Sequence, residues 1–199
     1  KLSVKWRTKY LSGIVTEYLV FPDGTVSASL TCKNITPVDL PRYGLTFELT
    51  DGVDGIEYYG KGPHENYCDR LSSADLGLYS QKVADQYHDE YVRPQESGTK
   101  SDLRWWSVVD SSGSGLVILS EAPFSASALP YATEALDVTN FPPQQHSGPL
   151  RSGDRTYVNF DLRQMGLGCI NSWGELPEDQ YMIPYGDYTF RFLLRPTVK

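Results

Sequence analysis

The sequence lacks basic runs, paired cysteines and long apolar segments, and each absence argues against a class of protein. Its 199 residues include 18 basic and 25 acidic side chains, a formal net charge of −7. This balance argues against nucleic acid and anionic membrane surfaces as partners, and no apolar run reaches the length of a membrane span. Cys32, Cys68 and Cys169 are far apart and form no CxxC motif. A zinc site and a disulfide framework are therefore disfavoured.

Recognisable catalytic and cofactor motifs are also scarce. The sequence has no GxSxG motif and no glycine-rich phosphate loop between a strand and a helix, which argues against α/β-hydrolases and nucleotide cofactors. His64-Glu65 and His88-Asp89-Glu90 are candidate acid–base or metal groups. Adjacent residues on a strand point to opposite faces, so neither group forms a site by itself. We therefore predict no cofactor and no metal site within this chain.

Short alternating segments and turn residues make up most of the chain. Residues 14–21 and 26–32 flank Pro22-Asp23-Gly24, and residues 105–110 and 116–120 flank Ser-Ser-Gly-Ser-Gly, so both regions predict hairpins. Further strands are predicted at 45–49, 56–59, 124–128, 158–162 and 188–194. The one helical signal covers 132–138, and the proline- and glutamine-rich residues 141–149 predict a loop. This pattern predicts an all-β fold, an antiparallel sandwich that forms a single domain across residues 1–199.

Two segments combine charged side chains with aromatic rings and glycines. They are residues 58–70, YYGKGPHENYCDR, and residues 91–106, YVRPQESGTKSDLRWW. We expect loops whose charged groups pair within the sandwich: Arg70, Arg104, Glu65 and Glu96. Each carboxylate of these segments lies near an arginine in the sequence, and a neighbouring positive charge favours the ionised form of a carboxyl group: Glu65, Asp69, Glu96 and Asp102. A general acid needs a raised pKa, so no catalytic role is assigned to them.

A third segment, residues 165–174 with the sequence MGLGCINSWG, follows the predicted strand at 158–162. Its tryptophan, Trp173, is either a core ring or an exposed platform. An exposed indole stacks on the apolar face of a pyranose ring, while Asn171 and Ser172 offer hydrogen bonds to sugar hydroxyls. From the residues alone, both readings stay open.

Taken in order, YYGKGPHENYCDR, YVRPQESGTKSDLRWW and QMGLGCINSWG resemble the C-terminal domain of the β-galactosidases of glycoside hydrolase family 2, also known as the small-chain domain or domain 5. The resemblance implies an antiparallel β supersandwich like that of galactose mutarotase. It also implies that the catalytic carboxylates, and the Mg and Na ions, belong to a preceding barrel domain, so that this chain alone is inactive. Trp173 matches the tryptophan that packs on the sugar, and Asn171 and Ser172 join it in the predicted substrate-binding set.

The resemblance further implies a C-terminal fragment of a larger multidomain β-galactosidase, which cleaves terminal non-reducing β-D-galactose residues by a retaining mechanism. The family's domain normally begins with further strands and an active-site loop ahead of Lys1. The expected partners are a β-galactoside or galactose, the preceding barrel domain of the same chain, and further copies in a homo-oligomer. A cytoplasmic location is favoured over secretion.

Three other functions stay open at this point. An aldose 1-epimerase would share the sandwich and use histidine and glutamate as acid and base, with His64 and Glu96 or His146 and Glu175 as the pairs to test. A stand-alone carbohydrate-binding module would bind sugar without chemistry. A purely structural domain would support the barrel and an oligomer interface.

Overall fold

The computed structural model describes residues 1–8, 13–33, 39–50, 52–91, 95–136, 150, 153–168, 170–171 and 173–198. The strands in these residues are β1 (Leu2–Trp6), β2 (Ile14–Val20), β3 (Val26–Cys32), β4 (Arg42–Thr50), β5 (Val53–Gly62), β6 (Asp75–Lys82), β7 (Lys100–Asp110), β8 (Gly115–Leu129), β9 (Arg155–Gln164) and β10 (Tyr188–Thr197). Between them lie the short helix α1 (Thr133–Leu136) and the 3-10 turns η1 (Val83–Asp85) and η2 (Asp179–Tyr181). None of the helices in the described residues is long and apolar enough to cross a membrane.

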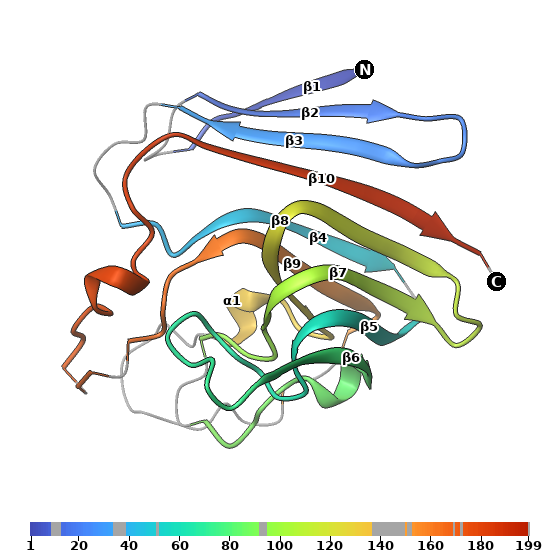
Figure 1. The fold of residues 1–199 in the computed structure, drawn as a ribbon. Helices are drawn as coiled ribbons and strands as arrows, with labels where there is room; N and C mark the ends of the chain where they lie inside the picture. Colours follow the sequence, from blue (N-terminus) through green and yellow to red (C-terminus); the bar gives the residue numbers. More distant parts are fainter. Residues whose placement is uncertain are drawn as a thin grey trace.

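The strands form two layers that share one long strand, and every pair is antiparallel. Hydrogen-bonded neighbours run in the order β1-β2-β3-β10-β8-β7-β5-β6, while β9 pairs with β8 and with β4. The first part of β8, residues 115–120, pairs with β10 and β7, and residues 125–129 pair with β9. Figure 1 shows β8 curving from one layer into the other. The prediction of an all-β sandwich is confirmed.

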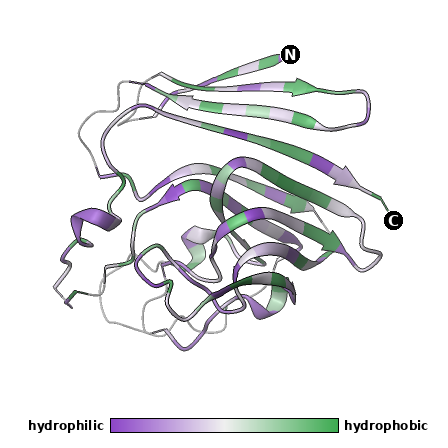
Figure 2. Cartoon of the chain, in the orientation of Figure 1, coloured by the Kyte–Doolittle hydropathy of each residue, from purple (hydrophilic) through white to green (hydrophobic). Residues whose placement is uncertain are grey.

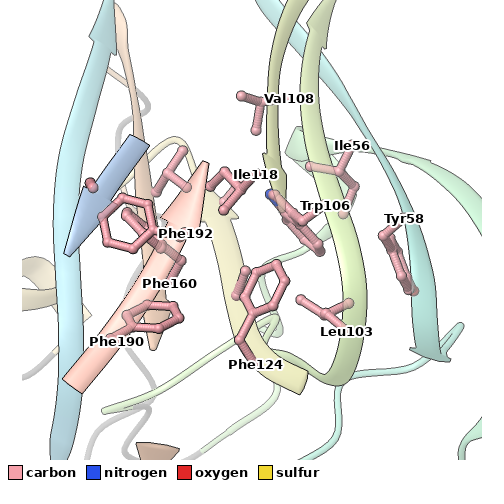
Figure 3. Packing of buried hydrophobic residues seen from close by; sticks show 14 of the residues in the cluster. Ile56, Tyr58, Leu103, Trp106, Val108, Ile118, Phe124, Phe160, Phe190 and Phe192 are labelled. Atoms are coloured by element: carbon pink, nitrogen blue, oxygen red, sulfur yellow. The ribbon is translucent and has the colours of Figure 1, made fainter. Parts of the chain in front are cut away.

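The core lies between the β4–β9 layer and the β3–β10 layer and continues to β7 and β5. Phe160 of β9 contacts Phe192 and Phe190 of β10, with ring centroids 4.9 and 5.9 Å apart. Trp106 of β7 stacks on Tyr58 of β5 at 5.2 Å, and Figure 3 shows these rings within one cluster of buried residues. Buried rings cover large apolar areas, which explains the high aromatic content of the chain.

Both predicted hairpins are present. Asp23 shapes the first turn, because its carboxylate accepts hydrogen bonds from the Thr25 N–H at 2.9 Å and the Thr25 hydroxyl at 3.0 Å. Figure 2 shows apolar and polar residues alternating along β3, as the sequence pattern predicts. The strands predicted at 116–120 and 124–128 are parts of the single strand β8. The local sequence pattern therefore predicts which residues are extended, but it does not show that two predicted strands belong to one continuous strand.

Other elements differ from the predictions. β6 was not predicted, because its residues DLGLYSQK include a glycine and expose Leu76 and Leu78, so the segment does not read as half-buried. It forms because β5 offers a free edge for pairing. The loops predicted at 58–70 and 91–106 are partly strand, since β5 extends to Gly62 and β7 begins at Lys100. Of the helix predicted at 132–138, α1 covers 133–136, and the loop predicted at 141–149 lies outside the described residues.

Candidate functional site

The tryptophan loop, as we call residues 165–176, follows β9, and its described residues 165–168, 170–171 and 173–176 lie at the left edge of Figure 1. Three backbone N–H groups attach the start of this loop to other segments. They are Met165 N–H to Pro41 O at 3.0 Å, Gly166 N–H to Tyr181 O at 2.9 Å, and Gly168 N–H to Asp69 Oδ2 at 3.0 Å. The position of the loop is therefore set by residues that are distant in the sequence.

Trp173 is 90% exposed, which excludes the core reading. Asn171 forms the turn that presents it: Asn171 Oδ1 accepts the Trp173 N–H at 2.8 Å, and Asn171 Nδ2 donates to Glu175 Oε2 at 2.7 Å. Gly174 has a φ of +87°, a region that favours glycine. Asn171 therefore uses its side chain within the loop, and Ser172 lies outside the described residues. Sugar contacts by these two residues stay predictions.

Other apolar side chains of the tryptophan loop are also in solvent. Leu167, Ile170 and Leu176 are exposed, in addition to Trp173. Single exposed apolar residues are ordinary, but several of them on one loop indicate an interaction surface. The loop thus has the composition of a segment that contacts a ligand or another domain.

The segment that contacts this loop through Asp69 also contains a buried carboxylate, Glu65. It accepts hydrogen bonds from Arg70, from the Tyr91 hydroxyl and, at 2.8 Å, from the Gly98 N–H. Burial by itself would raise the pKa of Glu65, but these hydrogen bonds stabilise the ionised form and hold the pKa below its usual range. Glu65 and Arg70, which were both expected to pair within the sandwich, form an ion pair with each other.

Glu96 forms an ion pair with Arg42, a residue that the sequence predictions did not include. Arg42 Nη1 also lies 3.6 Å from Asp161 Oδ2. Burial raises the pKa of Asp161 to about 7, although the guanidinium of Arg42 opposes the shift. Pairing of β4 with β9 brings Arg42 and Asp161 together. No local signal in the sequence could have identified this group.

A cleft of about 410 Å³ lies beside the start of the tryptophan loop. Its lining includes Cys68, Asp102, Arg163 and Tyr181, and Asp102 is the only non-glycine residue with a positive φ, 53°, in the part of the chain that the structure describes. This volume suits a small molecule. The carboxylate of Asp102, however, is paired with Arg104 at 3.3 Å, so the cleft does not supply the two carboxylates of a glycosidase site.

A family model described as β-galactosidase small chain matches residues 2–194. The chain belongs to the β-galactosidase small-chain family. It is 34% identical over 181 residues to a β-galactosidase from Vibrio cholerae, an alignment that covers 89% of this chain and 16% of that protein. It is 32% identical over 190 residues to a β-galactosidase from Priestia megaterium, covering 94% of this chain and 18% of that protein.

A β-galactosidase from Halalkalibacterium halodurans is 34% identical over 171 residues, which are 83% of this chain and 16% of the relative. The small-chain sequence therefore spans less than a fifth of the length of these relatives. The family assignment agrees with the resemblance of the three segments described above.

The pairing expected of Arg104 in this small-chain domain is present, but it lies at the surface and not in a buried pair. The side chain of Arg104 is 43% exposed and contacts Asp102, which is 34% exposed. Alternation along β7 is the physical reason, because Leu103 on the opposite face is fully buried in the core. Arg104 is therefore a surface residue.

The histidine–glutamate pairs of an epimerase find no support in this small-chain domain. His64 is exposed and Glu96 is held by Arg42, and in the described part of the chain no hydrogen bond or ion pair joins His64 to Glu96. In the second pair, Glu175 accepts a hydrogen bond from Asn171, whereas His146 lies outside the described residues.

Ser97 and Lys100 have the SxxK spacing of serine–lysine enzymes, although the sequence was expected to lack this motif. Both side chains are buried. Lys100 Nζ donates to Gln86 Oε1 at 2.7 Å and to Gly98 O at 3.1 Å, and burial lowers the pKa of Lys100 to about 8. Ser97 Oγ accepts the His88 N–H at 3.0 Å instead of bonding Lys100. The pair of Ser97 and Lys100 is structural.

Among the described residues no group of three or more potential metal ligands occurs.

Proposed function

We propose that this chain is the small-chain domain of a β-galactosidase that hydrolyses terminal non-reducing β-D-galactose residues. In this proposal Trp173 forms a wall of the sugar site, and the catalytic carboxylates belong to a barrel domain of the same protein. Family membership supports it, as do the names and the much greater lengths of the relatives from Vibrio cholerae and Priestia megaterium.

The exposure of Trp173 is the observation that carries the proposal. An indole that is 90% exposed contributes little to the core of the domain, and Asn171 and Gly174 shape the backbone turn that carries it. A ring that such a turn presents to solvent offers its apolar face to a sugar. The ring is thus suited to stacking on galactose in a site that another domain completes.

The carboxylates of this chain support a division of labour. Retaining hydrolysis needs two carboxyl groups about 5–5.5 Å apart, one of them with a raised pKa. Glu65 and Glu96 are held in ion pairs, and Asp161, although its pKa is raised, is buried beyond the reach of a sugar. We therefore place catalysis in other domains, and following the family resemblance we propose that the Mg and Na ions are bound there as well. We expect the isolated chain not to hydrolyse a chromogenic β-galactoside.

Replacement of Trp173 by Ala in the complete enzyme tests the proposal. Loss of an aromatic contact of about 0.5–1.5 kcal/mol should raise KM about two- to tenfold. The platform holds the ground state as well as the transition state, so kcat should change little. The melting temperature should stay the same, because the side chain contributes little to the core.

Leu78→Ala is the matched control. Leu78 is 73% exposed on β6 and lies outside the tryptophan loop, so this variant should keep the parent KM and melting temperature. An unchanged KM in Trp173→Ala would contradict the role of the ring. Turnover by the isolated chain would contradict the division of labour.

A further inference from the structure

We infer that Asp69 is a positioning residue that acts on the substrate through Trp173, by holding the start of the tryptophan loop. The inference rests on the proposed role of Trp173. Asp69 Oδ2 accepts the Gly168 N–H at 3.0 Å, across 99 positions of sequence. Gly168 is five positions ahead of Trp173 in the same loop. This hydrogen bond therefore holds the loop at a point close to Trp173.

Asp69 itself is held in place by the residues next to it in the sequence. It lies in a turn closed by the hydrogen bond from the Arg70 N–H to Tyr67 O at 2.8 Å. Arg70 is paired with the buried Glu65, and the guanidinium of Arg70 lies over the ring of Tyr67, 5.1 Å from its centroid. The carboxylate of Asp69 is therefore a fixed point supplied by the sandwich, and the loop is the part that it orients.

The glycines of the loop are adapted to this carboxylate. A Cβ atom on Gly166 would lie 2.6 Å from Asp69 Oδ2 and 2.8 Å from its Cγ, closer than side chains approach. Gly168, whose N–H donates to the carboxylate, has a φ of +86°, which most other residues avoid. The MGLG sequence thus lets the backbone pass directly over Asp69.

The other carboxylate oxygen shows that stability alone does not account for Asp69. Its Oδ1 atom is buried and has no hydrogen-bond partner among the residues that the structure describes. A buried acceptor without a partner lowers stability, so an apolar residue or a smaller polar one would serve the core better. A carboxylate at this position is explained if its Oδ2 atom is needed to hold the loop.

A double-mutant cycle in the complete β-galactosidase tests this inference. Asp69→Ala should raise KM about two- to tenfold, as Trp173→Ala does, with little change in kcat. In the Trp173→Ala background the same substitution should add nothing, because the loop then has no ring to orient. Asp69→Asn keeps an oxygen that can accept the Gly168 N–H, so it should restore most of the parent KM.

Two further measurements separate positioning from general destabilisation. Amide hydrogen exchange in the peptide that contains Gly168 should be faster in Asp69→Ala and close to the parent rate in Asp69→Asn. Val83→Ala, a change in the core residue of η1, should lower stability and leave KM and this exchange rate unchanged.

The outcomes distinguish the inference from the proposed function. A parent-like KM in Asp69→Ala, or KM effects of Asp69→Ala and Trp173→Ala that multiply in the double variant, would overturn the role of Asp69 alone. A parent-like KM in Trp173→Ala would overturn the proposed function, and this inference with it.

Discussion

Replacing Glu65 by Ala removes a carboxylate that is buried and accepts hydrogen bonds from Arg70, Tyr91 and the Gly98 N–H. Loss of one member of a buried ion pair costs about 3–5 kcal/mol. Arg70 is 44% exposed and can be solvated again, so we expect the lower end, about 3 kcal/mol. For a chain of this length, 1 kcal/mol lowers the melting temperature by about 2–4 °C. Glu65→Ala should therefore melt about 6–12 °C below the parent.

Arg104→Ala is the matched control for removal of a charge. The pair of Arg104 with Asp102 is exposed, at 43% and 34%, and such surface pairs contribute about 0–1 kcal/mol. Its melting temperature should stay within about 4 °C of the parent. Thermal and urea unfolding of the 199-residue chain measure both variants. Equal melting of Glu65→Ala and Arg104→Ala would refute the reasoning.

The pH dependence of the Glu65→Ala effect gives an independent check. The pKa of Glu65 is lowered in the folded state from a reference of 4.5, so the unfolded state binds more protons in this range. The stabilisation is fully present above the unfolded pKa and is lost as the pH falls through the folded pKa. The gap in unfolding free energy between parent and variant should be constant near neutral pH and shrink below about pH 4.5. A gap that stays the same down to pH 3 would show that the charge of Glu65 is not the cause.

Two other substitutions test the β4–β9 pairing. Burial raises the pKa of Asp161 to about 7, above its reference of 3.8, so the folded state takes up a proton and the stability contribution of this residue falls as pH rises between these values. The unfolding free energy of Asp161→Asn relative to the parent should therefore rise as the pH rises from about 4 to about 7 in urea titrations, and parallel pH profiles would contradict this. Gly44→Ala should destabilise by about 1–3 kcal/mol or more, because the added methyl group would overlap Phe160 O and the Asp161 carboxylate. Gly153→Ala, where the nearest atom lies 3.9 Å away, should melt like the parent, and equal melting of the two alanine variants would contradict the close packing at Gly44.

The parts of the fold that could be predicted depend on neighbouring residues. The first hairpin follows from alternation on both sides of Asp23-Gly24, and the structure shows the Asp23 carboxylate holding the turn through Thr25. Alternation likewise located the central parts of β9 and β10. Each of these signals lies within a few residues of the structure that it predicts.

The parts that could not be predicted depend on residues that are distant in the sequence. β6 exists because β5 offers an edge, and its own exposed leucines do not indicate a strand. Arg42 pairs with Glu96, 54 positions away, so the arginines near Glu96 in the sequence were poor guides to its partner. The outward direction of Arg104 depended on the register of β7, which its charge does not reveal.

By itself, the sequence determined the all-β class, because alternation with a period of two is a local property. Its three motif segments also determined the family. Tertiary structure decided whether Trp173 is part of the core or a platform. An indole between small and polar neighbours can be covered by distant segments or left in solvent, and the sequence leaves both outcomes open. In this protein Asp69, 99 positions before Gly168, accepts the Gly168 N–H and holds the loop at the edge of the sandwich, where no described residue covers the ring of Trp173. Burial is a sum of contacts between segments that only the complete fold brings together.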